Sequence, residues 1–360
     1  MPIAMTGNRI VTTTRAKLMP MVVDTVLLSN VFATMMLKEA KKWSGNQMQF
    51  PVKLSTNSTA TSFSGFDTFS TNATNNRDKL TFNPSFAQIT SALPQDELSV
   101  NQGSSAEEKI LDLAAVTLET DSQDLADYVG TMFYGDSTGN NNKDTNGLAN
   151  LCDDGTIAST IGGLSRSTYT TLQSTVTASG GTLTLAKMST LYNAITSGSV
   201  HPDFGVTTEA IFSLYEALLT PQLRMEPTRS DMTKMGNMGK EGSGMMGGYG
   251  FTSLYFKGFP IFADEKASSY AGRTAPLYFL NSRFLKWFGL PVAGAEAINY
   301  KAVPVEGNDY ENGVRGLGFS WSGWIKSIDQ AAIVGHTYLG GQLITDDPRR
   351  LGVLTGVTSV

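Results

Sequence analysis

The sequence has little of what most catalytic and metal sites are built from. Its 360 residues contain one cysteine, Cys152, and two histidines, His201 and His336. A single cysteine excludes an intrachain disulfide and a zinc site made of several cysteines, and it is typical of a reducing compartment. The histidines stand apart. His336 lies in the apolar run "AAIVGHTYLGG", which favours a strand histidine bonded within the fold over a catalytic base or a metal ligand.

Charge is also scarce. Charged residues make up 16% of the chain and hydrophobic residues 41%, whereas soluble proteins average about 25% charged residues. Because protein interfaces are depleted in Lys, Glu and Asp, this composition favours a chain with much of its surface against partners, although β-rich proteins share it. The net charge of −5 argues against an electrostatic grip on nucleic acid, but a protein that merely encloses nucleic acid is compatible with it.

The sequence shows neither a secretory start nor a membrane span. The opening "MPIAMTGNRIVTTTR" has no apolar signal core. Residues 18–37 are apolar, but a span needs about 20 nearly uninterrupted apolar residues. This segment is interrupted by Pro20, Asp24, Ser29 and Asn30. Leu27, Val31 and Met35 recur at every fourth position, which predicts an amphipathic helix packed on protein.

Two stretches resemble ligand-binding loops but lack the surroundings that such loops need. Residues 242–247, "GSGMMG", have the spacing of a dinucleotide-binding loop, yet a loop precedes them and a predicted strand follows. Residues 142–153 resemble a calcium loop, but Asn142 stands at the first position and Asp153 replaces the bidentate glutamate at the twelfth. A flexible loop and an Asn/Gly-rich turn are the simpler interpretations. We therefore predict no catalytic residue, no cofactor, no metal ligand and no enzyme activity.

The order of the predicted elements indicates an α+β protein. Residues 1–45 are predicted to form an arm that is extended at first and then forms a short helix to Lys42-Trp43. Residues 46–100 are predicted to form an extended hairpin with a long polar tip. Residues 104–135 form the clearest helix, because capping boxes open it and apolar residues follow at a spacing of three or four. Thr184 and Thr208 can cap two further helices. Short strands are predicted at 250–264, 277–280, 298–305, 314–320 and 331–345.

Residues 254–265, "LYFKGFPIFADE", hold four aromatic side chains and could form a pocket wall, a core hairpin or a contact surface. Strand alternation places Leu254 and Phe256 on one face and Tyr255 and Lys257 on the other. A bend is expected at the "GFP" that follows, where the ladder cannot continue unbroken. No catalytic or cofactor group accompanies the stretch, so a core β element is the favoured interpretation. Whether Tyr255 and Lys257 face solvent or another copy stays open.

Several longer stretches carry a family resemblance through their order and spacing. They are "MFYGDSTGNNNKDTNGLANL" after the long helix, then "IGGLSRSTYTTLQSTV", then "HPDFGVTTEAIFSLYEALL" at a strand-to-helix step, and finally "GFTSLYFKGFPIFADE" followed by "APLYFLNSRFLKWFG". Together with the arm, hairpin and long helix, they resemble the major capsid proteins of tailed bacteriophages, which have the Hong Kong 97-type shell fold. The resemblance covers most of residues 45–345.

The resemblance implies an α+β shell subunit with five parts. These are an N-terminal arm over 1–45, an extended hairpin loop over 46–100 that lies on a neighbouring subunit, a peripheral domain over 101–200 with a spine helix at 104–135, a mainly axial domain over 201–300, and a β-rich return to the peripheral domain over 301–360. The implied function is geometric: the chain would self-assemble into pentamers and hexamers of an icosahedral shell that encloses double-stranded DNA.

The resemblance also implies the partners and the location of the chain. The partners would be further copies of the chain, packaged DNA bound without sequence specificity, and portal and decoration proteins. No long charged helical segment precedes the arm, so a separate scaffold protein is implied if one is needed. The location would be the virion capsid, assembled in the host cytoplasm and without a membrane.

Six residues are candidate intersubunit contacts. They are Trp43, Phe63, Phe66, Phe69, Arg349 and Arg350. The two arginines follow "DDP" and would form either an intersubunit ion pair or a plain surface turn; the turn is favoured because exposed ion pairs are common and weak.

Two other functions stay open. An encapsulin-like nanocompartment shell shares the fold and encloses enzymes instead of DNA. A more remote alternative is a hydrolase that uses Ser165 or Ser253 with one of the two histidines.

Overall fold

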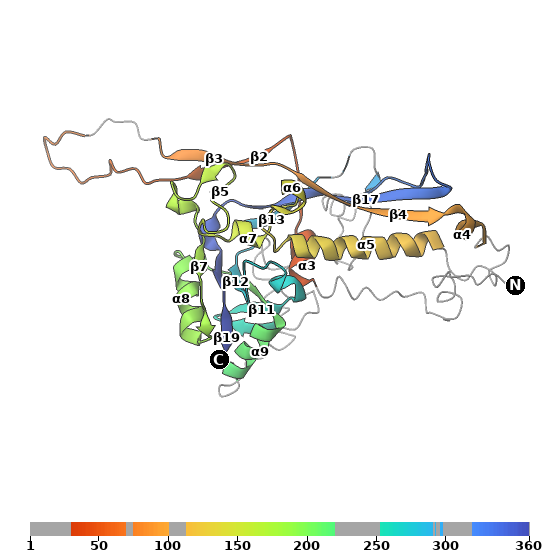
Figure 1. The fold of residues 1–360 in the computed structure, drawn as a ribbon. Helices are drawn as coiled ribbons and strands as arrows, with labels where there is room; N and C mark the ends of the chain where they lie inside the picture. The colour runs from red at the N-terminus through yellow and green to blue at the C-terminus, as the bar shows by residue number, and fades with distance from the viewer. Residues whose placement is uncertain are drawn as a thin grey trace, which may run out of the picture.

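The computed structural model describes residues 30–69, 75–100, 113–219, 253–290, 292, 296–297 and 319–359. It is an α+β structure, as expected, with a compact body, a long sheet-and-helix extension on one side and a thin hairpin on the other (Figure 1). The expected strand at 298–305, the loop at 225–249 and the "GSGMMG" motif lie outside the described residues.

The helices are few and separate from most of the strands. The α-helices are α3 Val31–Lys38, α4 Gln95–Val100, α5 Leu113–Met132, α6 Gly139–Asn142, α7 Leu148–Leu151, α8 Leu185–Ile195 and α9 Glu209–Leu219, and the 3-10 helices are η1 Thr170–Leu172, η3 Glu265–Ser268 and η5 Pro348–Arg350. The predicted caps of two helices are confirmed. Thr184 Oγ1 accepts the N–H of Lys187 at 3.3 Å, and Thr208 Oγ1 accepts that of Ile211 at 3.4 Å.

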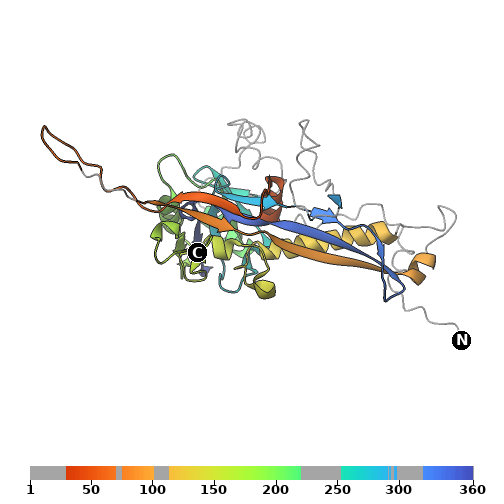
Figure 2. The same ribbon diagram turned by 90° about the horizontal axis from the view of Figure 1, so that it is seen from above.

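A seven-stranded sheet, called here the long sheet, is organised around strand β17, Ala332–Thr345. One edge of β17 pairs with β4, Ser85–Pro94, in a ladder that runs from Ala332↔Pro94 to Gly341↔Ser85. On its other edge β17 pairs with β16 Ile325–Lys326, β15 Phe319–Trp321 and β13 Leu285–Gly289, and the sheet is completed by β14 Glu296–Ala297 and β1 Lys41–Lys42. Two distant parts of the chain, near 90 and near 340, are thereby held side by side (Figure 2).

Helix α5 covers one face of the long sheet, where it contacts β4 and β17. The predicted apolar stripe is confirmed where its side chains are described, because Leu125, Val129 and Met132 are buried. The opposite face of β4 is solvent-exposed, because exposed residues alternate along this strand with intermediate or buried ones. The helix ends at Met132, three residues before the predicted end, and the predicted start at 104–112 lies outside the described residues.

The six-stranded sheet forms the core of the body. Its strand order is β10 Ser253–Phe256, β11 Phe259–Ala263, β9 Phe204–Thr207, β12 Leu277–Leu280, β18 Gly352–Leu354 and β7 Thr175–Thr177. The central strands are buried at nearly every position, which explains why they read as continuous apolar runs. Helix α8 packs against β18 and β7, and α9 packs against β11. Short pairs β5 Thr160–Ile161 with β6 Leu164–Ser165, and β8 Gly181–Thr182 with β19 Val357–Ser359, lie at the margins.

The expected hairpin is narrower than residues 46–100. Strands β2, Met48–Lys53, and β3, Arg77–Phe82, pair antiparallel and form what we call the ribbon. Strand β4 lies in the long sheet instead, because it pairs with β17 and not with β3. The ribbon rests on the core through Phe50, whose ring lies 6.3 Å from Phe82 and 5.8 Å from Phe288. Beyond it, residues 54–69 project away from the body (Figures 1 and 2).

The "LYFKGFPIFADE" stretch is a core hairpin, as predicted, but its bend differs from the expected one. Strands β10 and β11 pair from Ser253↔Phe262 to Phe256↔Phe259, and Pro260 is part of this ladder. The chain turns at Lys257 and Gly258, whose φ angles are 46° and 91°, as a two-residue hairpin requires. Lys257 is exposed, and its Nζ lies 4.5 Å from the centre of the Tyr192 ring.

The N-terminal segment also departs from expectation at its end. The predicted amphipathic helix is present as α3 and buries Val31 and Met35, but it ends at Lys38. Lys41 and Lys42 form a strand, not the helix expected to reach them, because they pair with Phe288 and Gly289 of β13.

Gly341 gives a test of how tightly the long sheet is packed. Its φ is +152°, and an added Cβ would lie 2.4 Å from Phe288 O and 2.5 Å from Trp287 Cζ2. We expect Gly341→Ala to lower the free energy of unfolding by about 3 kcal/mol through overpacking. Gly163→Ala is the control, since Gly163 has φ +85° but open space around it, and should cost only about 1–2 kcal/mol. Urea unfolding measures both; equal losses would contradict the packing argument.

Candidate functional site

The two histidines make local contacts. His336 Nδ1 lies 3.0 Å from Thr90 Oγ1 on the neighbouring strand β4, and His201 Nδ1 lies 3.0 Å from the carbonyl oxygen of Pro202. The His201 ring also stacks on Tyr192. Ser165, a candidate nucleophile, has its Oγ 2.9 Å from Ser167 Oγ. These contacts give no support to a serine–histidine pair.

A cluster of buried charged groups centres on Asp153, which has no exposed surface. Its Oδ2 accepts the backbone N–H groups of Gly155, Ile157 and Ala158 at 2.9, 3.0 and 2.9 Å. Two arginines complete the cluster: Arg166 Nη1 lies 3.3 Å from Oδ2, and Arg273 Nη2 lies 2.7 Å from Oδ1.

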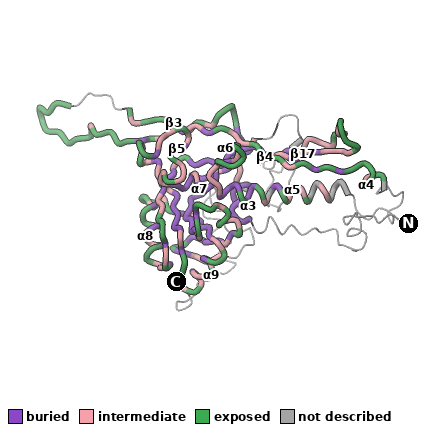
Figure 3. Tube along the Cα trace, viewed as in Figure 1, coloured by how far each residue is buried: buried purple, intermediate pink, exposed green. Residues whose placement is uncertain are grey.

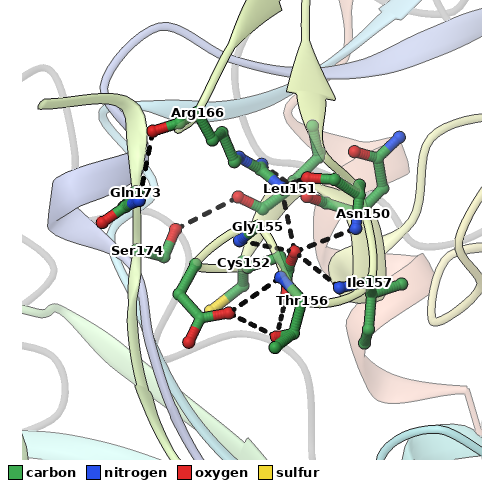
Figure 4. Close-up of polar contacts among 12 residues, drawn as sticks. Asn150, Leu151, Cys152, Gly155, Thr156, Ile157, Arg166, Gln173 and Ser174 are labelled. Carbon is green, nitrogen blue, oxygen red and sulfur yellow. Dashed lines mark hydrogen bonds and ion pairs between the residues drawn. The ribbon is translucent and has the colours of Figure 1, made fainter. Parts of the chain in front are cut away.

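Arg166 joins this carboxylate to the surrounding loops. Its guanidinium donates to the carbonyl oxygen of Asn150 at 2.6 Å (Figure 4). It also donates to the carbonyl oxygens of Ala158 at 2.9 Å and Leu172 at 3.3 Å. One side chain thus ties together carbonyl groups of α7 and η1 that are up to 22 residues apart in the sequence. The arrangement uses each charge for hydrogen bonds within the chain, which is what a buried ion pair requires.

The pKa shifts agree with a structural role for the cluster. Burial alone would raise the pKa of Asp153, but the backbone N–H groups and Arg166 outweigh burial and lower it. Burial raises the pKa of the neighbouring Cys152 thiol to about 12, so this cysteine is inert at neutral pH. Asp153 is engaged by two arginines, which contradicts the calcium-loop alternative for 142–153. Among the described residues no group of three or more His, Cys, Asp or Glu side chains could hold a metal ion.

A second buried carboxylate, Asp264, fastens α3 to the body. Asp264 Oδ2 accepts the backbone N–H of Phe32 at 2.8 Å and the hydroxyl of Tyr134 at 3.0 Å. Its Oδ1 accepts the N–H of Lys266 at 2.9 Å and caps η3. Asp264, the first of the two acids that close "LYFKGFPIFADE", is therefore a joint between the N-terminal segment, the end of α5 and β11.

The six candidate contact residues fall into three environments. Trp43 is only 2% exposed and lies in the chain's own core, where its Nε1 donates to Gly45 O. Arg349 and Arg350 both pair with Asp347 within the turn, at 2.8 and 3.3 Å. The contact role stays a prediction for the three phenylalanines, which lie in the projecting segment that Figure 3 shows as exposed.

The three phenylalanines form an unusual surface. Phe66 is fully exposed, Phe63 is 67% exposed and Phe69 is 60% exposed. The rings of Phe63 and Phe69 meet edge to face at 5.2 Å, but no core lies beneath them. We call residues 54–69 the tip. Exposed large apolar side chains gathered in one place mark an interaction surface.

Sequence reasoning missed the two buried carboxylates. The partners of Asp153 lie 13 and 120 residues away, and Asp264 joins residues up to 232 positions apart. No local spacing signals such pairs. The three phenylalanines could be recognised as candidate contacts from the sequence, because they recur within a segment that is otherwise rich in Ser, Thr and Asn.

Comparisons with known proteins establish the fold. No protein-family model matches the chain, and no curated protein matches its sequence. Solved structures do match over nearly full length. The capsid subunit of cyanophage A-1(L) has a TM-score of 0.67 at 12% identity, with 96% of this chain and 97% of that one covered. The capsid of the native GTA particle has a TM-score of 0.55 at 10% identity, covering 99% of both chains.

The SrpI encapsulin of Synechococcus elongatus is also similar, with a TM-score of 0.54, 11% identity, and coverage of 97% of this chain and 95% of that chain. The chain therefore has the shell fold found in the major capsid proteins of tailed phages, as the sequence resemblance implied. Among the described residues, no helix is both long enough and apolar enough to cross a membrane.

The ion cluster gives the second prediction. Asp153→Asn leaves two buried arginines without their counter-charge and should lower the free energy of unfolding by about 3–5 kcal/mol. Asp347→Asn, which breaks the partly exposed pairs with Arg349 and Arg350, should cost about 1 kcal/mol or less. Because the pKa of Asp153 is lowered in the folded chain, its stabilisation is present above the unfolded pKa and is lost as the pH falls below about 4. Urea unfolding from pH 7 to pH 3 measures this; a pH profile unchanged by Asp153→Asn would contradict it.

Proposed function

We propose that the chain is a major capsid protein, a structural subunit of an icosahedral shell that encloses double-stranded DNA. The observation that carries the proposal is the similarity to phage shell subunits over 96–99% of this chain. The similar structures are shells, and the histidines, the buried thiol and the Asp153 cluster make contacts that hold the fold together. The chain acts through its shape and its contacts, without catalysis.

Under this proposal the elements take the roles that the resemblance implies. Helix α5 is the spine helix, the ribbon and tip are the loop that lies on a neighbouring copy, and the six-stranded sheet with α8 and α9 belongs to the axial part. Copies assemble as pentamers and hexamers. Packaged DNA, a separate scaffold, a portal and decoration proteins are the partners, and the virion capsid, assembled in the host cytoplasm, is the location.

The tip supports assembly on physical grounds. Three phenylalanines that are at least 60% exposed on a segment without its own core are unfavourable in water. Covering them against another copy removes that cost. The segment is therefore stabilised in a shell and not in the isolated chain, so assembly and the ordering of the tip are coupled.

A nanocompartment shell is the second candidate, because the SrpI encapsulin matches this chain nearly as well as the GTA capsid does. The contents separate the two functions. Particles isolated from the native source should hold nuclease-protected double-stranded DNA if the chain is a capsid protein. Particles that hold an enzyme and no DNA would favour the nanocompartment.

Assembly itself is the third prediction. Purified protein should form closed shells, seen by gel filtration and electron microscopy, under some condition of salt, pH or added scaffold. Replacing Phe63, Phe66 and Phe69 together by Ser should lower shell yield at least about tenfold, because most of the apolar contact area of the tip is lost. Thr59→Ser in the same segment is the matched control. A strictly monomeric protein under all conditions would contradict the proposed function.

A further inference from the structure

A polar groove lies where the ribbon joins the body. Its larger pocket has a volume of about 550 Å³, within the range of about 300–1,000 Å³ that is typical of ligand pockets. The lining comes from the β3–β4 connection at 81–86, from α6, α7 and the loops beside them, from the β5–β6 turn and from Gln342 of β17 (Figure 1). A smaller pocket of about 290 Å³ adjoins it, because Ser137 and Asp144 line both pockets. We call the two pockets together the groove.

The larger pocket has a fixed framework. The buried Gln342 accepts the backbone N–H of Asn146 at 2.7 Å through Oε1 and donates to the carbonyl oxygen of Asn83 at 3.1 Å through Nε2. One side chain thus ties β17 to the β3–β4 connection and to the loop before α7. Asn150 Nδ2 adds hydrogen bonds to Ser137 Oγ and Asn146 Oδ1, both at 3.1 Å. Because the fold sets this shape, little ordering is needed when a ligand enters.

Aromatic rings line both pockets. Phe86 lines the larger pocket and is 54% exposed. It lies opposite Gly340 on β17, where an added Cβ would be 2.8 Å from Phe86 Cε1, so the glycine leaves room for the ring. Tyr128, which is 39% exposed, and Tyr270 line the smaller pocket. Rings that the fold holds in place at the surface offer flat apolar faces to a ligand.

The polar lining consists mainly of groups that can both donate and accept hydrogen bonds. Side-chain amides and hydroxyls predominate in the larger pocket: Asn83, Ser85, Ser137, Asn142, Asn146 and Asn150. Asn142 is exposed, and its side chain makes no hydrogen bond to a described residue. In the smaller pocket the hydroxyls of Tyr128 and Tyr270 donate to Asp144 Oδ1 at 3.2 Å and to Asp136 Oδ2 at 3.1 Å.

The loop that serves both pockets has an unusual backbone. Ser137, Asn140, Asn141 and Asn142 have φ angles of 71°, 50°, 59° and 62°. This left-handed conformation costs free energy for any residue with a side chain, although asparagine tolerates it better than most. Strained residues that gather in one loop are typical of ligand-binding sites. Here the loop supplies lining residues to both pockets.

A sugar matches this combination of groups. Its ring has a C–H face that packs on an aromatic ring, and each hydroxyl can donate and accept. We propose that the groove binds a neutral oligosaccharide, with a sugar ring against Phe86 and sugar hydroxyls on the amides of Asn142 and Asn146. Asp136 and Asp144 disfavour an anionic ligand, and an apolar ligand would leave the lining amides unpaired. Sugar binding would be a function additional to shell assembly and does not depend on it.

Titration of the purified chain with three trisaccharides, maltotriose, cellotriose and chitotriose, tests the proposal. Saturation-transfer NMR detects binding, and calorimetry measures the Kd. We expect at least one trisaccharide to bind with a Kd of about 1 mM or lower. A Kd above about 10 mM for all three would overturn the inference.

Variants test whether the sugar lies in the groove. Phe86→Ala should raise the Kd about five- to tenfold, because the ring that packs on the sugar is lost. Asn142→Asp keeps the size of the side chain and should raise the Kd about threefold, because an amide donor is lost. Gln88→Ala is the matched control, since Gln88 is exposed on the same face of β4 as Phe86 and lies outside the groove. Circular dichroism checks that each variant is folded.

Binding that neither Phe86→Ala nor Asn142→Asp changes, or that Gln88→Ala weakens as much as they do, would place the sugar elsewhere and overturn the inference. Either result would leave the proposed shell function intact, because assembly is measured separately by gel filtration and electron microscopy.

Discussion

The pairing of β17 with β4 is the constraint on which the rest of the structure depends. This ladder joins residues near 90 to residues near 340, and the other edge of β17 carries β13, β15 and β16. The sheet face that helix α5 covers is formed by these two strands. The ribbon leaves the body in a fixed direction because β3 leads, after two residues, into β4. Weakening this strand pair would release both ends of the molecule from the body.

Two buried carboxylates connect segments of the chain that the two main sheets do not join. Asp153 draws the loops after α5 around two arginines, and Asp264 holds the start of α3 against the end of α5. Both lie among apolar side chains, where an unpaired charge is costly and a fully bonded one fixes a single arrangement. The shell function proposed above would need such fixed geometry, because an error in one copy would be repeated in every contact that copy makes.

The sequence alone predicts those helices and strands that are determined by residues close together in the chain. Thr184 and Thr208 cap their helices, the stripe of α5 is buried where it is described, and the apolar run at 331–345 is a strand. What could not be predicted is set by partners far along the chain. Strand β4 alternates as a hairpin strand would, and only the position of β17 decides that it belongs to the long sheet. Trp43 is a candidate intersubunit contact from the sequence, but the structure buries it in the chain's own core, directly after β1, which pairs with β13.

The direction of the long ladder has a mechanical consequence. Strands β4 and β17 run along the length of the molecule, from the body to the turn between β16 and β17 (Figure 2). A pull between the two ends, as pressure inside a closed container would produce, acts along these strands and not across them. Their hydrogen bonds are then loaded in shear and must break together, not one after another. The chain therefore resists a pull along its length more strongly than a pull across its strands.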